Sequence, residues 1–87
     1  MTKTKQLEIA NYCYAFASGM FAEFHNPNMR GDKFTWTNFP SMVERLARAQ
    51  VFTSVSMTKK TQVEIEDKAA EYAKEIANTL IKRAGYI

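Results

Sequence analysis

Apolar side chains in the N-terminal third of the chain recur at helical spacing, on two adjacent rows. The spacing predicts a helix over residues 7–24. The first row comprises Leu7, Ala10, Tyr14, Ala17, Phe21 and Phe24, and the second comprises Ile9, Cys13, Phe16 and Met20. A helix that is apolar around most of its circumference must be covered on most sides, which two partner helices of a small domain cannot do. We therefore expect surplus apolar surface that binds a second subunit or another partner.

The C-terminal third carries the signals of a second long helix. Thr61 and Glu64 have the spacing of a capping box, and Gly85 can adopt the left-handed cap that ends a helix. We therefore predict a helix from Thr61 to about Ala84. Its expected core stripe is Ile65, Ala69, Tyr72, Ile76 and Leu80, and beside it lies a mostly small row that allows close helix packing, Val63, Ala70, Ala77 and Ala84.

A shorter helix is expected between these two. Ser41 and Glu44 form another capping-box pattern, with Asn38 or Pro40 marking the entry, and the helix should end near Gln50 or Phe52. Its apolar side comprises Met42, Val43, Leu46, Ala47 and Ala49. The sequence thus predicts an all-α fold with one helical domain over 1–87, a long antiparallel helix pair and a short middle helix.

Two segments leave an α+β alternative open. Residues 33–37 and 51–56 are both rich in strand-forming residues with polar residues between them. They could pair as a two-stranded ribbon around the middle helix, although an isolated strand pair is marginally stable without packing support.

Composition narrows the class of protein. The chain has 87 residues, 46% of them hydrophobic, and a net charge of +3 that is spread along the sequence. No apolar run approaches the ~20 residues of a membrane span, and no continuous basic patch indicates nucleic acid. One cysteine cannot form an internal disulfide. We therefore expect a cytoplasmic protein without a membrane segment.

The loop over residues 25–38 is the first place to look for chemistry, and it has two interpretations. In the functional one, Arg30 and Lys33 bind a phosphate or carboxylate while Phe34 or Trp36 stacks on a ring or fills a pocket. In the structural one, Phe34, Trp36 and Phe39 fold back to plug the core, as large aromatic side chains beside a helix entry usually do.

Other candidate sites are weaker. Lys59 and Lys60, ahead of the last helix, could hold an anion, and Tyr12 could stack on a nucleotide base. One His and one Cys cannot build a zinc site, and phosphate-cradling glycine patterns are absent from the sequence. Cys13 lies in an apolar row, where a thiol is normally inert. We expect no catalytic, cofactor or metal site.

These expectations describe a small non-enzymatic binding protein. We expect it to self-associate through the first and last helices and to occlude or sequester a protein partner. Its size and character are similar to those of phage-encoded inhibitors of host or defence proteins. A sequestering module for a small anionic ligand such as a nucleotide is the first alternative, and a DNA-associated or scaffold protein is the second.

Overall fold

The computed structural model describes residues 2–54 and 62–87, and within them the regular structure is entirely helical. The elements are α1 (Lys3–Glu23), a short 3-10 helix η1 (Pro27–Met29), α2 (Phe39–Ser54) and α3 (Gln62–Arg83). The long helices α1 and α3 pack against each other, and α3 also packs against α2. The predicted all-α class is confirmed.

The α+β alternative is not supported. Residues 33–37 form turns ahead of α2, and residues 51–54 belong to α2 itself. Residues 55 and 56 of the second predicted strand lie outside the described residues. The rings of Phe34 and Trp36 instead pack against the core.

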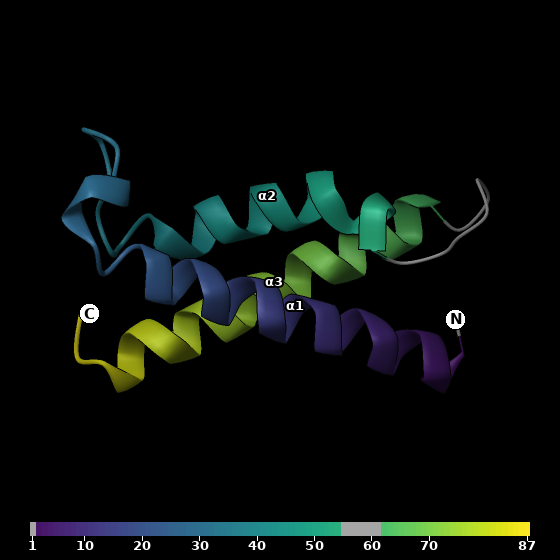
Figure 1. Cartoon of the computed structure of the whole chain (residues 1–87). Coiled ribbons are helices and arrows are strands. Elements are labelled where there is room, and N and C mark those ends of the chain that lie inside the picture. Colours follow the sequence, from purple (N-terminus) through teal and green to yellow (C-terminus); the bar gives the residue numbers. More distant parts are fainter. Residues whose placement is uncertain (1, 55–61) are drawn as a thin grey trace.

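The direction of the long pair differs from the prediction. Figure 1 shows that α1 and α3 start at the same end of the molecule and run the same way, with α2 running back between them along the chain. Cys13 contacts Ala69 and, further along both helices, His25 contacts Tyr86. Three helices joined in succession reverse direction twice, so the first and third are parallel rather than antiparallel.

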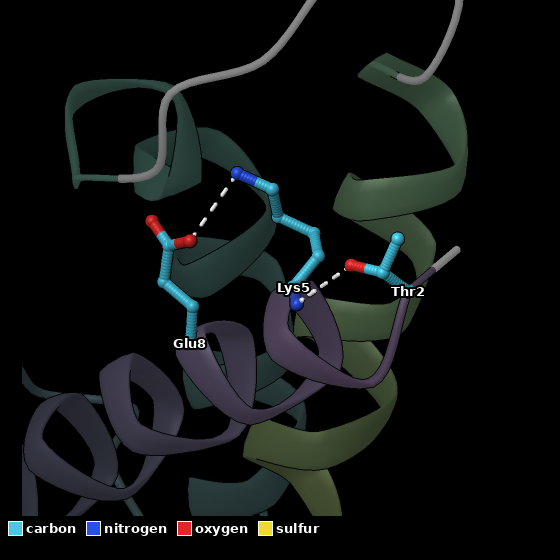
Figure 2. A network of polar contacts seen from close by, with 3 residues as sticks. All are labelled: Thr2, Lys5 and Glu8. Atoms are coloured by element: carbon cyan, nitrogen blue, oxygen red, sulfur yellow. Dashed lines mark hydrogen bonds and ion pairs between the residues drawn. The ribbon is translucent and has the colours of Figure 1, made fainter.

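Helix α1 begins four residues earlier than its apolar rows predict. Thr2 is the N-cap, and its hydroxyl oxygen accepts a hydrogen bond of 3.1 Å from the backbone N–H of Lys5. The Lys5 ammonium also lies 3.2 Å from the Glu8 carboxylate, as Figure 2 shows. Polar capping and a local ion pair therefore extend the helix into a segment with few apolar residues.

Helix α2 ends later than predicted, at Ser54, and its start agrees with Asn38, one of the two predicted entries. It begins at Phe39, so Ser41 lies inside the first turn and not at the N-cap. The Asn38 carbonyl accepts from the Met42 N–H at 3.1 Å, which makes Asn38 the entry. Pro40 is tolerated in the first turn because its missing N–H would have no helical partner there.

The end of α3 agrees with the prediction. Gly85 has a φ of +78°, in the left-handed region. The Tyr86 N–H donates to the Ile81 carbonyl at 3.0 Å, and the Gly85 N–H donates to the Lys82 carbonyl at 3.1 Å. This pair of bonds is the Schellman cap that a glycine after a helix favours. At the other end, the predicted N-cap Thr61 lies outside the described residues.

The core is narrower and richer in small residues than the predicted stripes. Its fully or almost fully buried members are Ile9, Cys13, Ala17, Met20, Phe39, Val43, Ala47, Ile65, Ala69, Ala73, Ala77 and Ile81. On α1 the second predicted row supplies most of the core, whereas Leu7 and Tyr14 of the first row are exposed. On α3 the buried face includes Ala73 and Ile81, which the stripe omitted, and Tyr72, Ile76 and Leu80 are only half-buried.

The small residues of α3 permit the close approach that their spacing predicts. The Cys13 thiol donates to the Ala69 carbonyl at 3.2 Å, a contact between a side chain of α1 and the backbone of α3. Ala70 and Ala77 of the predicted small row are buried. Val63 is exposed, as is Ala84 beyond the last turn of α3.

Candidate functional site

Figure 1 shows that the end of α1, the start of α2 and the end of α3 lie at one end of the molecule. Aromatic side chains from these segments and from the loop between α1 and α2 contact one another there. We call this group the aromatic end; it comprises Phe21, Phe24, His25, Phe34, Trp36, Phe39 and Tyr86. Trp36 stacks on Tyr86 with ring centroids 4.7 Å apart, and Phe24 meets Phe34 edge to face at 5.1 Å. Such pairs stabilise the packing of the loop beyond the contribution of buried area alone.

The loop reaches this cluster through short turns. The Asn26 side chain accepts from the Asn28 N–H at 3.0 Å and starts η1, and Thr35 accepts from the Asn38 N–H at 3.1 Å. Phe39 is completely buried, and Phe34 and Trp36 pack partly buried against the core. The structural interpretation, in which these aromatic residues plug the core, is therefore the one that the structure supports.

Arg30 is held within the aromatic end. Its Nε donates to the Phe24 carbonyl at 2.6 Å, and its guanidinium carbon lies 5.4 Å from the Phe34 centroid and 5.5 Å from that of Trp36. A guanidinium stacked on two rings and bonded to backbone has a structural task. Fewer of its donors remain for the phosphate fork that the sequence suggested.

Both ring nitrogens of His25 have partners. Nδ1 lies 2.7 Å from the Phe21 carbonyl, and Nε2 lies 2.7 Å from the Tyr86 hydroxyl. A carbonyl oxygen only accepts, so Nδ1 carries a proton, and in the neutral ring Tyr86 donates to Nε2. The imidazole therefore ties the end of α1 to the residue after the cap of α3.

Lys33 faces a different surface from Arg30. It lines a depression of about 360 Å³ between the loop and the first turns of α2. The other lining residues are Gly31, Phe34, Asn38, Ser41, Met42 and Arg45. Sequence reasoning missed Arg45 here, because a basic residue on a helix usually indicates nothing more than solubility. The fold of the loop onto α2 is what brings Arg45 and Lys33 to one depression.

The remaining predicted site residues do not join this loop. Tyr12 stacks on Phe16 with centroids 5.8 Å apart, and it precedes Phe24 by twelve residues, about 18 Å along a helix. Lys59 and Lys60 lie outside the described residues. The predicted site residues therefore lie in three separate places. Arg30 belongs to the aromatic end, Lys33 lines the depression, and Tyr12 lies in the middle of α1.

A groove runs between α1 and α2, which contact each other much less than either contacts α3. It has a volume of about 470 Å³. Its apolar lining includes Phe16, Met20, Phe24 and Leu46. We call it the α1–α2 groove. The groove exists because α3 packs against both α1 and α2, which therefore contact each other only slightly.

Cys13 has the properties of a packing residue. Burial raises the pKa of its thiol to about 11, an effect that the backbone of Ala73 partly offsets. A thiol with a raised pKa holds little of the nucleophilic thiolate at neutral pH.

Neither metal ligation nor a membrane span emerges from the part of the chain that the structure describes. Residues 2–54 and 62–87 contain no group of three or more His, Cys, Asp or Glu side chains placed to hold a metal ion. The helices of the same residues include none with the length and apolarity to cross a bilayer. No family model, curated protein or solved structure matches the chain. Function must therefore be inferred from the surfaces of the molecule itself.

Proposed function

We propose that this protein is a small non-enzymatic binding protein that self-associates and acts by occluding or sequestering a protein partner. The observation that supports self-association is the exposure of Leu7 and Tyr14 on α1, which are 62% and 64% accessible. They lie seven residues apart, hence on one face of the helix. Large apolar side chains exposed together mark interaction surfaces more often than isolated ones do.

The surroundings of Tyr14 favour a second copy of the chain as the occupant. Beside it lies a depression of about 310 Å³ between α1 and α3, lined by Tyr14 and by Ile76 and Leu80 of α3. In a dimer with twofold symmetry, the Tyr14 ring of each copy can enter this depression on the other copy, so the surface is complementary to itself. Glu75 and Arg83 on the same rim have opposite charges that can pair across such an interface.

The α1–α2 groove is the surface that we propose for the protein partner. It lies on the opposite flank of α1 from Tyr14, so a dimer formed through Tyr14 leaves it open. Its lining is apolar except for Glu23 and Gln50, and this suits an amphipathic helix or loop of another protein better than a polar metabolite. More specifically, we propose that the protein inhibits its partner by covering the partner's functional surface, as phage-encoded inhibitors of host or defence proteins do.

Sedimentation velocity tests the self-association. We expect a dimer or larger species at micromolar concentration, and we expect Tyr14→Lys to weaken association by more than about tenfold, because it places a charge in an apolar interface. Ala49→Lys, which adds the same charge at an exposed position of α2, is the matched control and should associate like the parent. A parent chain that stays monomeric at high concentration contradicts the proposal.

Native mass spectrometry of protein purified from its own host tests the partner. We expect a co-purifying protein to remain bound to Ala49→Lys and to be lost from Leu46→Lys, which charges the α1–α2 groove. A partner retained by both variants would place its binding surface elsewhere on the molecule.

A further inference from the structure

We infer that the depression between the loop and the first turns of α2 is a binding site for a small ligand that carries a phosphate group and a planar ring, as a nucleotide does. Its volume of about 360 Å³ falls within the ~300–1,000 Å³ of small-molecule sites. This surface is separate from Tyr14 and from the α1–α2 groove.

The charge of the lining favours an anion. Lys33 from the loop and Arg45 from α2 both line the depression, and no acidic residue does. Neither forms an ion pair within residues 2–54 and 62–87. The nearby acid Glu44 instead lies 3.8 Å from Lys74 of α3. Two uncompensated cations at one depression create a positive potential that attracts and orients a phosphate.

The start of α2 adds hydrogen-bond donors to these charges. Ser41 lies in the first turn of this 16-residue helix, and Asn38 directly precedes it. In this turn the Phe39 N–H donates to the Trp36 carbonyl at 3.3 Å and Pro40 has no N–H, so the backbone donor left for a ligand is the Ser41 N–H. The helix dipole is positive at the same end. The exposed Ser41 hydroxyl is a further donor to a phosphate placed between Lys33 and Arg45.

Phe34 and Met42 supply the apolar part of the lining. The Phe34 ring is held by its neighbours, with centroid distances of 5.1 Å to Phe24 and 5.0 Å to Trp36 and with the Arg30 guanidinium 5.4 Å away. A ring fixed in this way loses little conformational entropy when a ligand packs on it. The aromatic end thus supports one wall of the site, and the phosphate side is formed by α2.

The test is a titration of isotopically labelled protein, followed by the amide resonances of residues 31–45. Adenosine monophosphate, inorganic phosphate and adenosine are the three probes. We expect saturable shifts with adenosine monophosphate, and weaker binding of each of the other two, because each lacks one half of the proposed contacts. Inorganic phosphate that binds as tightly as adenosine monophosphate would overturn the ring contact and with it the assigned ligand class.

Charge variants decide whether the depression itself binds the ligand. Lys33→Gln and Arg45→Gln should each weaken binding of adenosine monophosphate roughly tenfold or more, since each removes a charge-assisted contact, and affinity should fall as salt rises. Lys82→Gln removes the same charge from an exposed position near the end of α3 and should leave the affinity unchanged. No saturable shifts, or equal weakening by all three variants, would overturn the site. Circular dichroism of each variant verifies that it is folded.

Discussion

Two regions of the core, one end and the middle of the bundle, are built from different types of residue. At the aromatic end, large rings from α1, α2, the loop between them and the residues after α3 fill the space. The middle of the bundle is instead a seam of small side chains such as Cys13, Ala69 and Ala73. Rings seal an irregular space where elements begin and end. Small residues bring helix backbones together, but they bury little area per residue and leave neighbouring apolar groups uncovered.

This difference explains where apolar side chains remain exposed for binding. The rings of the aromatic end pack mostly against one another, so this end leaves little apolar surface uncovered. It supports the neighbouring depression through Phe34. Along the seam, close packing of α1 on α3 turns Leu7 and Tyr14 outward. The proposed sites follow this contrast. The apolar surface with Leu7 and Tyr14 lies along the seam, and the basic depression with Lys33 and Arg45 lies beside the aromatic end.

The largest expected effect is the loss of the central ring of the aromatic end. Phe39 is fully buried and meets Phe21, Phe24, Phe34 and Trp36. Phe39→Ala should reduce the free energy of unfolding by about 3–5 kcal/mol, a large part of the stability of a small domain.

Phe16→Ala is the matched control for this prediction. Phe16 lines the α1–α2 groove and is only half-buried, so its loss should cost about 1–2 kcal/mol. Urea unfolding followed by circular dichroism measures both. Equal costs would mean that the aromatic end is no better packed than the open groove, and the comparison would fail.

The sequence predicted the elements better than their arrangement. Helix periodicity, the cap at Gly85 and the place of Cys13 in an apolar row are local properties, so they could be identified from the chain alone. Periodicity indicates which residues face inward but not which helix they face. It therefore placed the half-buried Tyr72 and Ile76 in the core stripe and missed Ala73, because α3 contacts two helices at once.

The candidate site was predictable only in part. Lys33 and Phe34 stand in a loop whose composition indicates function, and both line the depression. Arg45 lies on a helix among other exposed basic residues, and its sequence environment does not distinguish it from Arg48, which pairs with Asp67. The fold distinguishes these two arginines, since it places the loop beside Arg45 and Asp67 of α3 beside Arg48.

A smaller effect should follow from overfilling the seam. Ala73 is completely buried on α3, close to Cys13. Ala73→Leu inserts three carbon atoms where backbones approach closely, and we expect a loss of about 1–3 kcal/mol in urea unfolding. Ala22→Leu, at an exposed position of α1, should be nearly neutral. A stable Ala73→Leu protein would show that the seam has spare volume, and the contrast with the aromatic end would then be one of residue type only.

The smallest expected loss of stability concerns the backbone turn after α3. Gly85 ends α3 with a φ of +78° and directs Tyr86 onto Trp36 and His25. Gly85→Ala forces a side chain into the left-handed region and should cost about 1 kcal/mol, a loss of roughly 4–8 °C in melting temperature. It should also change the fluorescence of Trp36, the single tryptophan of the chain.

The same substitution at Gly19 should have the opposite sign. Gly19 lies inside α1, and a Cβ added there would meet nothing within 4 Å. Because alanine favours a helix interior over glycine, Gly19→Ala should stabilise the protein by about 0.5–1 kcal/mol and leave the Trp36 fluorescence unchanged. If Gly85→Ala leaves both the melting temperature and the fluorescence as they are, the cap does not hold Tyr86 in place. The aromatic end would then depend on the loop alone, and not on the turn that closes α3.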